Sequence, residues 1–134
     1  MDKVSPAVRS YTMSQVRRRD TGPELLLRKA LWHRGVRGWR VDVARLPGRP
    51  DLAFSRQRIA VFVDGGFWHG HPSRYRPGQS GKYWDRKIER NQERDRLANE
   101  GLAAQGWRVL RLWDFDVVRD PYRAARQVQD LLHL

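Results

Sequence analysis

Residues 59–63 (IAVFV) form a continuous apolar run between polar turns. An uninterrupted run of this length predicts a central strand buried on both faces, because a strand with one face in water alternates apolar and polar residues. Such a strand needs partner strands at its edges and helices above and below it. This segment therefore favours a layered fold with a sheet at its centre.

The rest of the chain supplies these partners. Thr21-Gly22-Pro23-Glu24 has the form of a capping box and predicts a helix through about residue 34. Other segments have strand or helix character: strands at 39–43, 51–54 and 107–113, a helix over 82–105, and a last helix after Asp120-Pro121. This order predicts an α/β fold in which a mixed central sheet has helices on both faces.

The first and last helices are expected to bury apolar faces against the sheet. The positions concerned are Leu26, Leu27, Ala30 and Leu31 in the first helix, and Tyr122, Ala125, Val128, Leu131 and Leu132 in the last.

The charge balance indicates a polyanionic partner. The chain has 27 lysines and arginines against 15 aspartates and glutamates, a formal net charge of +12. Nucleic acid is the simplest explanation for such an excess. Six tryptophans, four tyrosines and four phenylalanines are too many for a basic disordered tail, so the chain should fold.

A length of 134 residues suits one domain. We expect a basic N-terminal arm over residues 1–19 and a single domain over 20–134. No apolar run approaches the roughly 20 residues of a membrane span, and the N-terminus has no signal-peptide pattern, so a cytoplasmic protein with no membrane partner is expected. The absence of cysteine excludes disulfides, cysteine-bound zinc and a thiol nucleophile.

Two acidic residues flank the predicted hairpin. Asp51 lies at the start of one strand and Asp64 at the end of the next, so their carboxylates can converge on one edge of the sheet. Two carboxylates with substrate phosphate and water suit Mg²⁺. An aspartate after proline is more often a turn or cap residue, and that reading stays open at this point.

A glycine-rich loop over residues 64–81 carries the next candidates. Phe67 and Trp68 are adjacent on it, so at least one should be exposed, where it can stack on or between bases. His69 follows and can take a proton from water. The alternatives are that both aromatic rings cover the sheet and that His69 is an ordinary surface residue.

One face of the long helix is also a candidate DNA contact. Lys87, Asn91 and Arg94 follow at spacings of four and three, so they share a face that can grip a groove or backbone. A solvated face with paired charges is the alternative.

Together these features are similar to the very short patch repair (Vsr) DNA mismatch endonuclease family over nearly the whole chain. The matching residues are Arg9-Ser10, Met13, Arg19-Asp20-Thr21, Glu24, Leu46-Pro47-Gly48-Arg49-Pro50-Asp51, Asp64-Gly65, Phe67-Trp68-His69, His71, Tyr83-Trp84, Lys87-Ile88, Asn91, Glu93-Arg94-Asp95-Arg96, Gly106-Trp107-Arg108-Val109-Leu110 and Trp113. Several motifs in the right order are more specific than any one of them.

The resemblance implies a restriction-endonuclease-like core and an enzyme that uses Mg²⁺, with two ions expected, to nick DNA 5′ to the thymine of a T:G mismatch. Such mismatches arise when 5-methylcytosine is deaminated, and the nick would start short-patch repair. By resemblance, Asp51 is the metal-bridging carboxylate, the main-chain carbonyl of Val63 is a second metal contact, and His69 is the general base. Asp64 and Glu24 would hold metal-bound water or orient His69.

The resemblance also implies how DNA is bound. Phe67, Trp68 and Trp84 would enter the base stack from the major groove, Met13 would press in from the minor groove, and Lys87 and Asn91 would contact the neighbourhood of the mispair. The partner is double-stranded DNA with a T:G mismatch, and a monomer suffices for one asymmetric lesion.

The chain departs from the family at a structural zinc site. Better-known members hold zinc with three cysteines and one histidine; here His71 remains, but the cysteine positions are Gly66, Ser73 and Phe115. One histidine cannot hold a tetrahedral zinc. We therefore expect no structural zinc, with Phe115 filling the space as an apolar plug.

Two other functions remain open from the sequence. A restriction-type or broader structure-specific nuclease on the same core would cut paired duplex at a short site or nick several mismatches. A non-catalytic DNA-binding module would use Asp51 and His69 only as fold residues.

Overall fold

The computed structural model describes residues 22–133. Its strands are β1 (Arg40–Val41), β2 (Leu52–Phe54), β3 (Ile59–Asp64) and β4 (Arg108–Trp113). They form one sheet in the order β1-β2-β3-β4, antiparallel except for the parallel pair β3 and β4. The predicted mixed α/β sheet is confirmed, and the apolar run 59–63 lies in an inner strand. The basic arm, Met13 and Thr21 lie outside the described residues.

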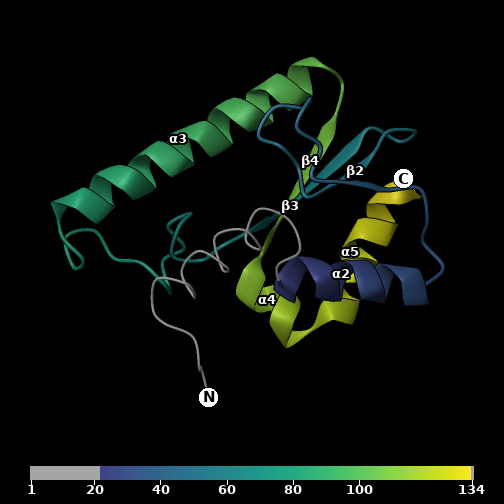
Figure 1. Ribbon diagram of the computed structural model, residues 1–134, viewed down its shortest axis with the longest axis horizontal. Coiled ribbons are helices and arrows are strands. Elements are labelled where there is room, and N and C mark those ends of the chain that lie inside the picture. The colour runs from purple at the N-terminus through teal and green to yellow at the C-terminus, as the bar shows by residue number, and fades with distance from the viewer. Residues whose placement is uncertain (1–21, 134) are drawn as a thin grey trace, which may run out of the picture.

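Helices cover both faces of the sheet, as predicted (Figure 1). The helices are α2 (Gly22–His33), α3 (Lys82–Ala104), α4 (Asp114–Arg119) and α5 (Pro121–Leu132). On one face, α2, α4 and α5 pack over a core that includes Leu27, Val61 and Val128. On the other, Leu102 of α3 packs with Ala60 and Phe62 of β3. Alternate residues of β3 thus enter two separate cores, which is why the run has no polar position.

The predicted apolar faces of the short helices need two corrections. Leu26 is 37% exposed and Tyr122 is 57% exposed. In α2 the buried stripe is Leu27, Ala30 and Leu31, and Leu26 lies at its edge. In α5 the buried residues include Ala124, which was not expected, with Ala125 and Val128. Small alanines bring α5 close to its neighbours, which leaves the larger Tyr122 in the first turn outside the core.

The predicted strand 39–43 is much shorter than expected. Asp42 has a φ of 50°, so regular strand geometry ends at Val41, although the Asp42 and Val43 amides still donate to the carbonyls of Asp51 and Pro50 at 3.1 Å. Helix α4 was also missed, because it follows β4 with no separating glycine or proline. The predicted cap of α5 is confirmed, since the Asp120 side chain accepts from the Arg123 amide at 3.1 Å.

Two features of this fold position the candidate site. The hairpin from β2 to β3 brings residue 51 beside the end of β3, since Leu52 pairs with Val61. Helix α3 has 23 residues, roughly 34 Å at 1.5 Å per residue, and its N-terminal half runs past the sheet beside loop 65–81 (Figure 1). No helix within residues 22–133 is long and apolar enough to cross a membrane.

Candidate active site

The first part of the site is the carboxylate of Asp51. Its Oδ2 accepts a hydrogen bond of 2.6 Å from the Val63 amide, and its carboxyl also bonds to the Glu24 side chain from α2. Burial raises the pKa of Asp51, an effect opposed by the Val63 and Glu24 bonds and reinforced by the nearby charge of Asp64. The structure therefore brings Asp51, Glu24 and Asp64 together at one end of the sheet.

The Val63 carbonyl points toward the same place. The amide and carbonyl of one strand residue lie on the same side of the strand, and the Val63 amide points at Asp51. The Val63 main-chain oxygen therefore lies on the side of β3 that faces Asp51.

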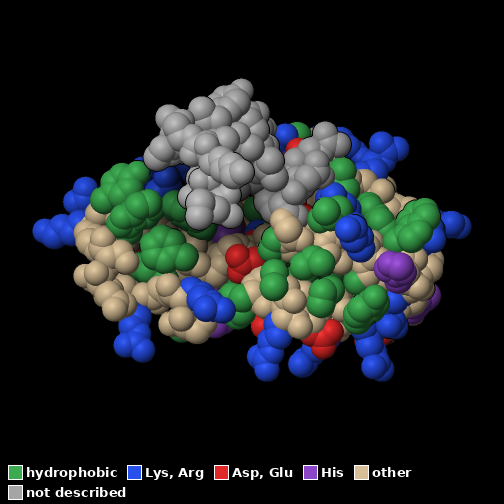
Figure 2. Space-filling view, turned by 60° about the horizontal axis from the view of Figure 1, so that its bottom comes forward, with side chains coloured by type: hydrophobic (Ala, Val, Ile, Leu, Met, Phe, Trp, Pro, Cys, Tyr) green, Lys and Arg blue, Asp and Glu red, His purple; other side chains and the backbone are tan. Residues whose placement is uncertain are grey.

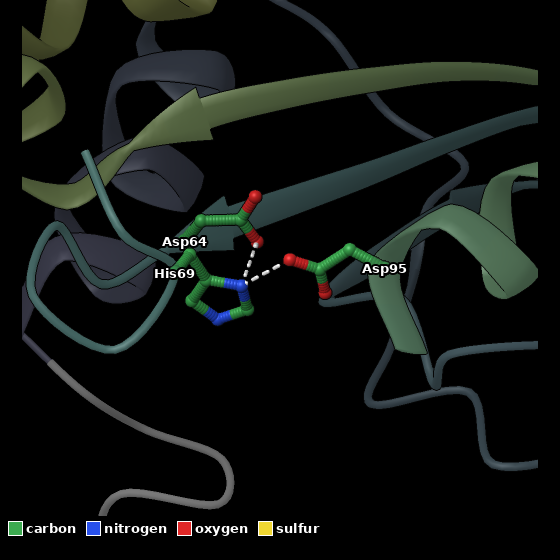
Figure 3. Close-up of side chains that lie close together, drawn as sticks. All are labelled: Asp64, His69 and Asp95. Atoms are coloured by element: carbon green, nitrogen blue, oxygen red, sulfur yellow. Dashed lines mark hydrogen bonds and ion pairs between the residues drawn. The ribbon is translucent and has the colours of Figure 1, made fainter. Parts of the chain in front are cut away.

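The second part of the site is a cluster of His69, Asp95 and Asp64 (Figure 3). His69 comes from the loop after β3, Asp95 from α3, and Asp64 from the end of β3. The Nδ1 atom of His69 lies 2.5 Å from Asp95 Oδ2 and 3.9 Å from Asp64 Oδ1. Nδ1 is therefore bonded to Asp95, and the other ring nitrogen, Nε2, points away from both carboxylates (Figure 3).

The electrostatics of this cluster favour a basic imidazole. Burial lowers the pKa of His69, but the hydrogen bond to Asp95 and the charges of Asp64 and Asp95 outweigh it, so the net direction is upward. Burial also raises the pKa of Asp64, against the lowering effects of His69 and Arg111. A carboxylate on Nδ1 fixes the tautomer with a bare Nε2, which can accept a proton from water.

Two residues of the cluster were not among the predicted site residues. Asp95 is four positions after Asn91 on α3, so the helical period already placed it on the same face. Arg111 interrupts the strand sequence WRVLRLW at an inward position, which was a signal for a buried partner. Arg111 Nη1 lies 3.0 and 3.1 Å from the two oxygens of Asp64.

The third part of the site is an aromatic cluster formed by Phe67 and Trp68 of the same loop and Trp84 of α3. Phe67 makes edge contacts with Trp68 and Trp84, with ring centroids 5.6 and 5.8 Å apart, and the two tryptophans are 5.3 Å apart. Trp68 is 37% exposed, whereas Phe67 and Trp84 are half-buried. The structure thus gathers the three rings singled out in the sequence and leaves Trp68 at the surface.

Lys87 and Asn91 support this cluster from α3. Asn91 Nδ2 donates to the Trp68 carbonyl at 2.9 Å, and Lys87 Nζ lies 5.4 Å from the Trp68 ring centroid. The face predicted to grip DNA therefore also holds Trp68 in place.

Side chains near the family's zinc positions form a packed cluster. The His71 ring lies 4.6 Å from the Trp113 ring and 4.9 Å from the Phe115 ring, measured between centroids. A Cβ at residue 66 would lie 2.7 Å from Arg74 Cγ and 2.9 Å from Phe115 Cε2, so Arg74 and Phe115 together fill the space beside Gly66. The His71 Nδ1 atom accepts from the Ser73 amide at 3.0 Å.

Figure 2 shows one face of the molecule on which the types of side chain are separated. Acidic side chains are visible near its middle, hydrophobic side chains lie on both sides of them, and lysines and arginines surround the rim. A cationic rim around a small acidic centre suits a polyanion that brings its own phosphate to the site.

Comparison with known proteins identifies the family. The family model described as DNA mismatch endonuclease Vsr matches residues 1–75. The DNA mismatch endonuclease Vsr of Escherichia coli is 39% identical over 81% of this chain and 70% of its own length. The chain belongs to the Vsr family.

Other Vsr-family relatives carry a different name. The type II nicking enzyme V.HpaIIP of Haemophilus parainfluenzae is 37% identical over 99% of this chain and 96% of its own length. The type II nicking enzyme V.NaeI of Lentzea aerocolonigenes is 42% identical over 95% of this chain and 78% of its own length. The protein is thus a DNA nicking endonuclease of the Vsr family, whose nucleases use Mg²⁺.

Proposed function

We propose that this protein nicks the strand 5′ to the thymine of a T:G mismatch left by deaminated 5-methylcytosine, and so starts short-patch repair. One observation carries this proposal: Phe67 and Trp68, two rings of the aromatic cluster, immediately precede His69 in the loop after β3. A side chain that separates bases and a group that activates water then act on the same stretch of DNA.

The aromatic cluster supplies the preference for a mismatch. A T:G wobble pair is more easily deformed than a Watson-Crick pair, so inserting rings into the stack costs least there. We assign insertion to Phe67, Trp68 and Trp84, and contacts beside the mispair to Lys87 and Asn91. Met13, outside the described residues, is assigned to the minor-groove side.

The donors around Asp51 fit Mg²⁺. They are hard oxygen atoms: the Asp51 carboxylate, the Val63 carbonyl, and the Glu24 carboxyl bonded to Asp51. Asp51 and Val63 would hold the metal, with two ions expected, and Glu24 would hold a metal-bound water. Bound there, Mg²⁺ supplies positive charge to the scissile phosphate and the leaving oxygen.

His69 acts as the general base in this proposal. Its Nε2 accepts the proton of the attacking water, while the bond from Nδ1 to Asp95 at 2.5 Å keeps the ring in the required tautomer. Asp64 adds negative charge 3.9 Å from Nδ1, which stabilises the imidazolium that forms. The products are a 5′ phosphate and a 3′ hydroxyl.

We further propose that no structural zinc is bound and that a monomer acts on the lesion. The packing of Phe115 beside Gly66 and His71 supports the first point. Elemental analysis of purified protein should find no stoichiometric zinc; one equivalent of zinc would contradict this. Light scattering of the complex with one mismatched duplex should give one chain per duplex.

The name of several relatives, type II nicking enzyme, favours a second candidate: nicking of paired DNA at a short site. A duplex panel separates the two. T:G, other mismatches and fully paired duplex are incubated with Mg²⁺ or EDTA, and the products are mapped to the nucleotide. A Mg²⁺-dependent nick 5′ to thymine in T:G alone supports our proposal. A nick in paired duplex supports the second candidate, and binding without cleavage indicates a DNA-binding module.

A further inference from the structure

Arg111 is held in place by groups outside the chemical centre. It projects from β4 toward α3 with a side chain only 19% exposed, and its guanidinium carbon lies 4.0 Å from the Phe62 ring centroid. Its Nε donates to Asn99 Oδ1 at 2.9 Å. The contacts with the Phe62 ring and the Asn99 side chain fix the planar guanidinium, and so they fix the directions in which Nη1 and Nη2 donate.

Those donors reach both acids of the His69 cluster. Nη1 lies 3.0 and 3.1 Å from the two Asp64 oxygens and 3.5 Å from Asp95 Oδ1. Nη2 donates to the Asp95 main-chain carbonyl at 3.4 Å. One planar cation therefore connects the end of β3 to the middle of α3, and its shortest contacts are with Asp64.

This geometry bears on which acid binds the imidazole. His69 has one Nδ1 hydrogen and two nearby carboxylates, at 2.5 Å (Asp95) and 3.9 Å (Asp64). Both Asp64 oxygens lie at hydrogen-bond distance from Arg111 Nη1, whereas Asp95 Oδ2 is directed at the ring (Figure 3). Without Arg111, Asp64 would compete for Nδ1, and the two carboxylates would repel each other.

We propose that Arg111 is a positioning residue that holds Asp64 away from His69, so that Asp95 alone orients the imidazole with Nε2 facing the DNA. The proposal rests on the assigned role of His69 as general base. On this proposal, the loss of kcat caused by replacing Arg111 depends on the presence of Asp64. A merely structural role of Arg111 would give the same loss with or without Asp64.

The test is a cycle of variants. Arg111→Met keeps an aliphatic chain on Phe62 and removes the charge; it is made in the natural sequence and in the Asp64→Asn background. In the natural sequence, we expect Arg111→Met to lower kcat by roughly 10- to 100-fold and to change KM for DNA by no more than about twofold. In the Asp64→Asn background, the same substitution should lower kcat by less than about threefold. Arg108→Met, an exposed arginine of the same strand, is the matched control.

The Nδ1–H proton resonance of His69, measured by NMR without DNA, gives a readout independent of nicking. This resonance should be present in the natural protein and in Arg108→Met, and weakened in Arg111→Met and Asp95→Asn.

If the natural protein nicks no duplex, the proposed function fails while this signal still tests Arg111. If Arg111→Met does not fold, Arg111→Lys replaces it, because lysine keeps the charge but loses the planar fork. Equal losses of kcat in both backgrounds, or an unchanged Nδ1–H signal in the Arg111 variant, would overturn the proposal.

Discussion

The two faces of the sheet are built differently. The face under α2, α4 and α5 carries the larger apolar core, in which buried residues from all three helices pack on β2, β3 and β4. The opposite face has a smaller core, to which the 23-residue α3 contributes Leu102. Along the rest of its length, α3 presents polar side chains to the loop and strand residues of the site, among them Asn91, Asp95 and Asn99.

Because of this difference, the α2 face contributes most of the stability, whereas the α3 face orients side chains of the site. Burial of apolar area supplies most of the folding free energy, and here it is concentrated on the α2 face. Side chains on the α3 face are held by directed hydrogen bonds, which contribute less net stability but fix orientation. Substitutions on the two faces should therefore have different consequences, and four predictions test this.

The largest effect is expected at Asp51. Asp51→Ala removes the proposed metal-bridging carboxylate, a loss of several kcal/mol that corresponds to roughly a 10³-fold or greater fall in nicking rate. DNA affinity should be retained, because phosphate contacts come from lysines and arginines. Single-turnover nicking and a gel-shift titration measure the two quantities. Equal loss of both in folded protein would contradict the assignment.

The next effect is on the apolar face. Leu27 is fully buried, and Leu27→Ala should lower the free energy of unfolding by about 2–5 kcal/mol. The adjacent Leu26, at 37% exposed, gives a matched control, with a change of about 1 kcal/mol or less for Leu26→Ala. Urea denaturation measures both, and the protein that remains folded should nick at the natural rate. If both substitutions lowered the free energy of unfolding by similar amounts, the buried core on this face would not be the main source of stability.

The aromatic cluster should give a smaller, selective effect. Trp68→Ala removes one stacking ring, which is worth about 1–3 kcal/mol, and should reduce the preference for T:G over paired duplex by that amount. General DNA affinity should change less, because the cationic rim is intact. Competition binding between the two duplexes measures the preference. An unchanged preference in Trp68→Ala would contradict insertion of Trp68 into the base stack.

The smallest effect is expected at the surface of the apolar face. Tyr122 is 57% exposed, so Tyr122→Ala should change stability by no more than about 0.5 kcal/mol and leave nicking unchanged. Thermal denaturation and the nicking assay check this. A larger loss of stability would mean that the core extends to this ring.

Much of the fold could be predicted because its signals are local. The uninterrupted run 59–63 located β3, and Asp120-Pro121 located the start of α5. What failed depended on tertiary packing: the periodicity of α5 did not reveal that Ala124 would be buried in place of Tyr122, and no local signal marked the turn at Asp42.

The residues of the candidate site likewise fall into those that the sequence predicted and those that it did not. Asp51 and Asp64 could be expected to meet, because a hairpin brings the start of one strand beside the end of the next. Local patterns marked the faces on which Asp95 and Arg111 lie, but not their partners, because they reach His69 and Asp64 from α3 and β4, whose packing around the sheet no short segment encodes.

The proposed function depends on one step, in which the aromatic cluster opens the DNA at a T:G pair beside the hydrolytic centre. Its most direct test is the fluorescence of 2-aminopurine placed next to the mismatch, with Asp51→Ala protein so that DNA is bound but not cut. We predict a large change in fluorescence on the T:G duplex, little change on the fully paired duplex, and loss of the signal when Trp68→Ala is added. Equal signals on the two duplexes, or a signal that does not depend on Trp68, would contradict the claim.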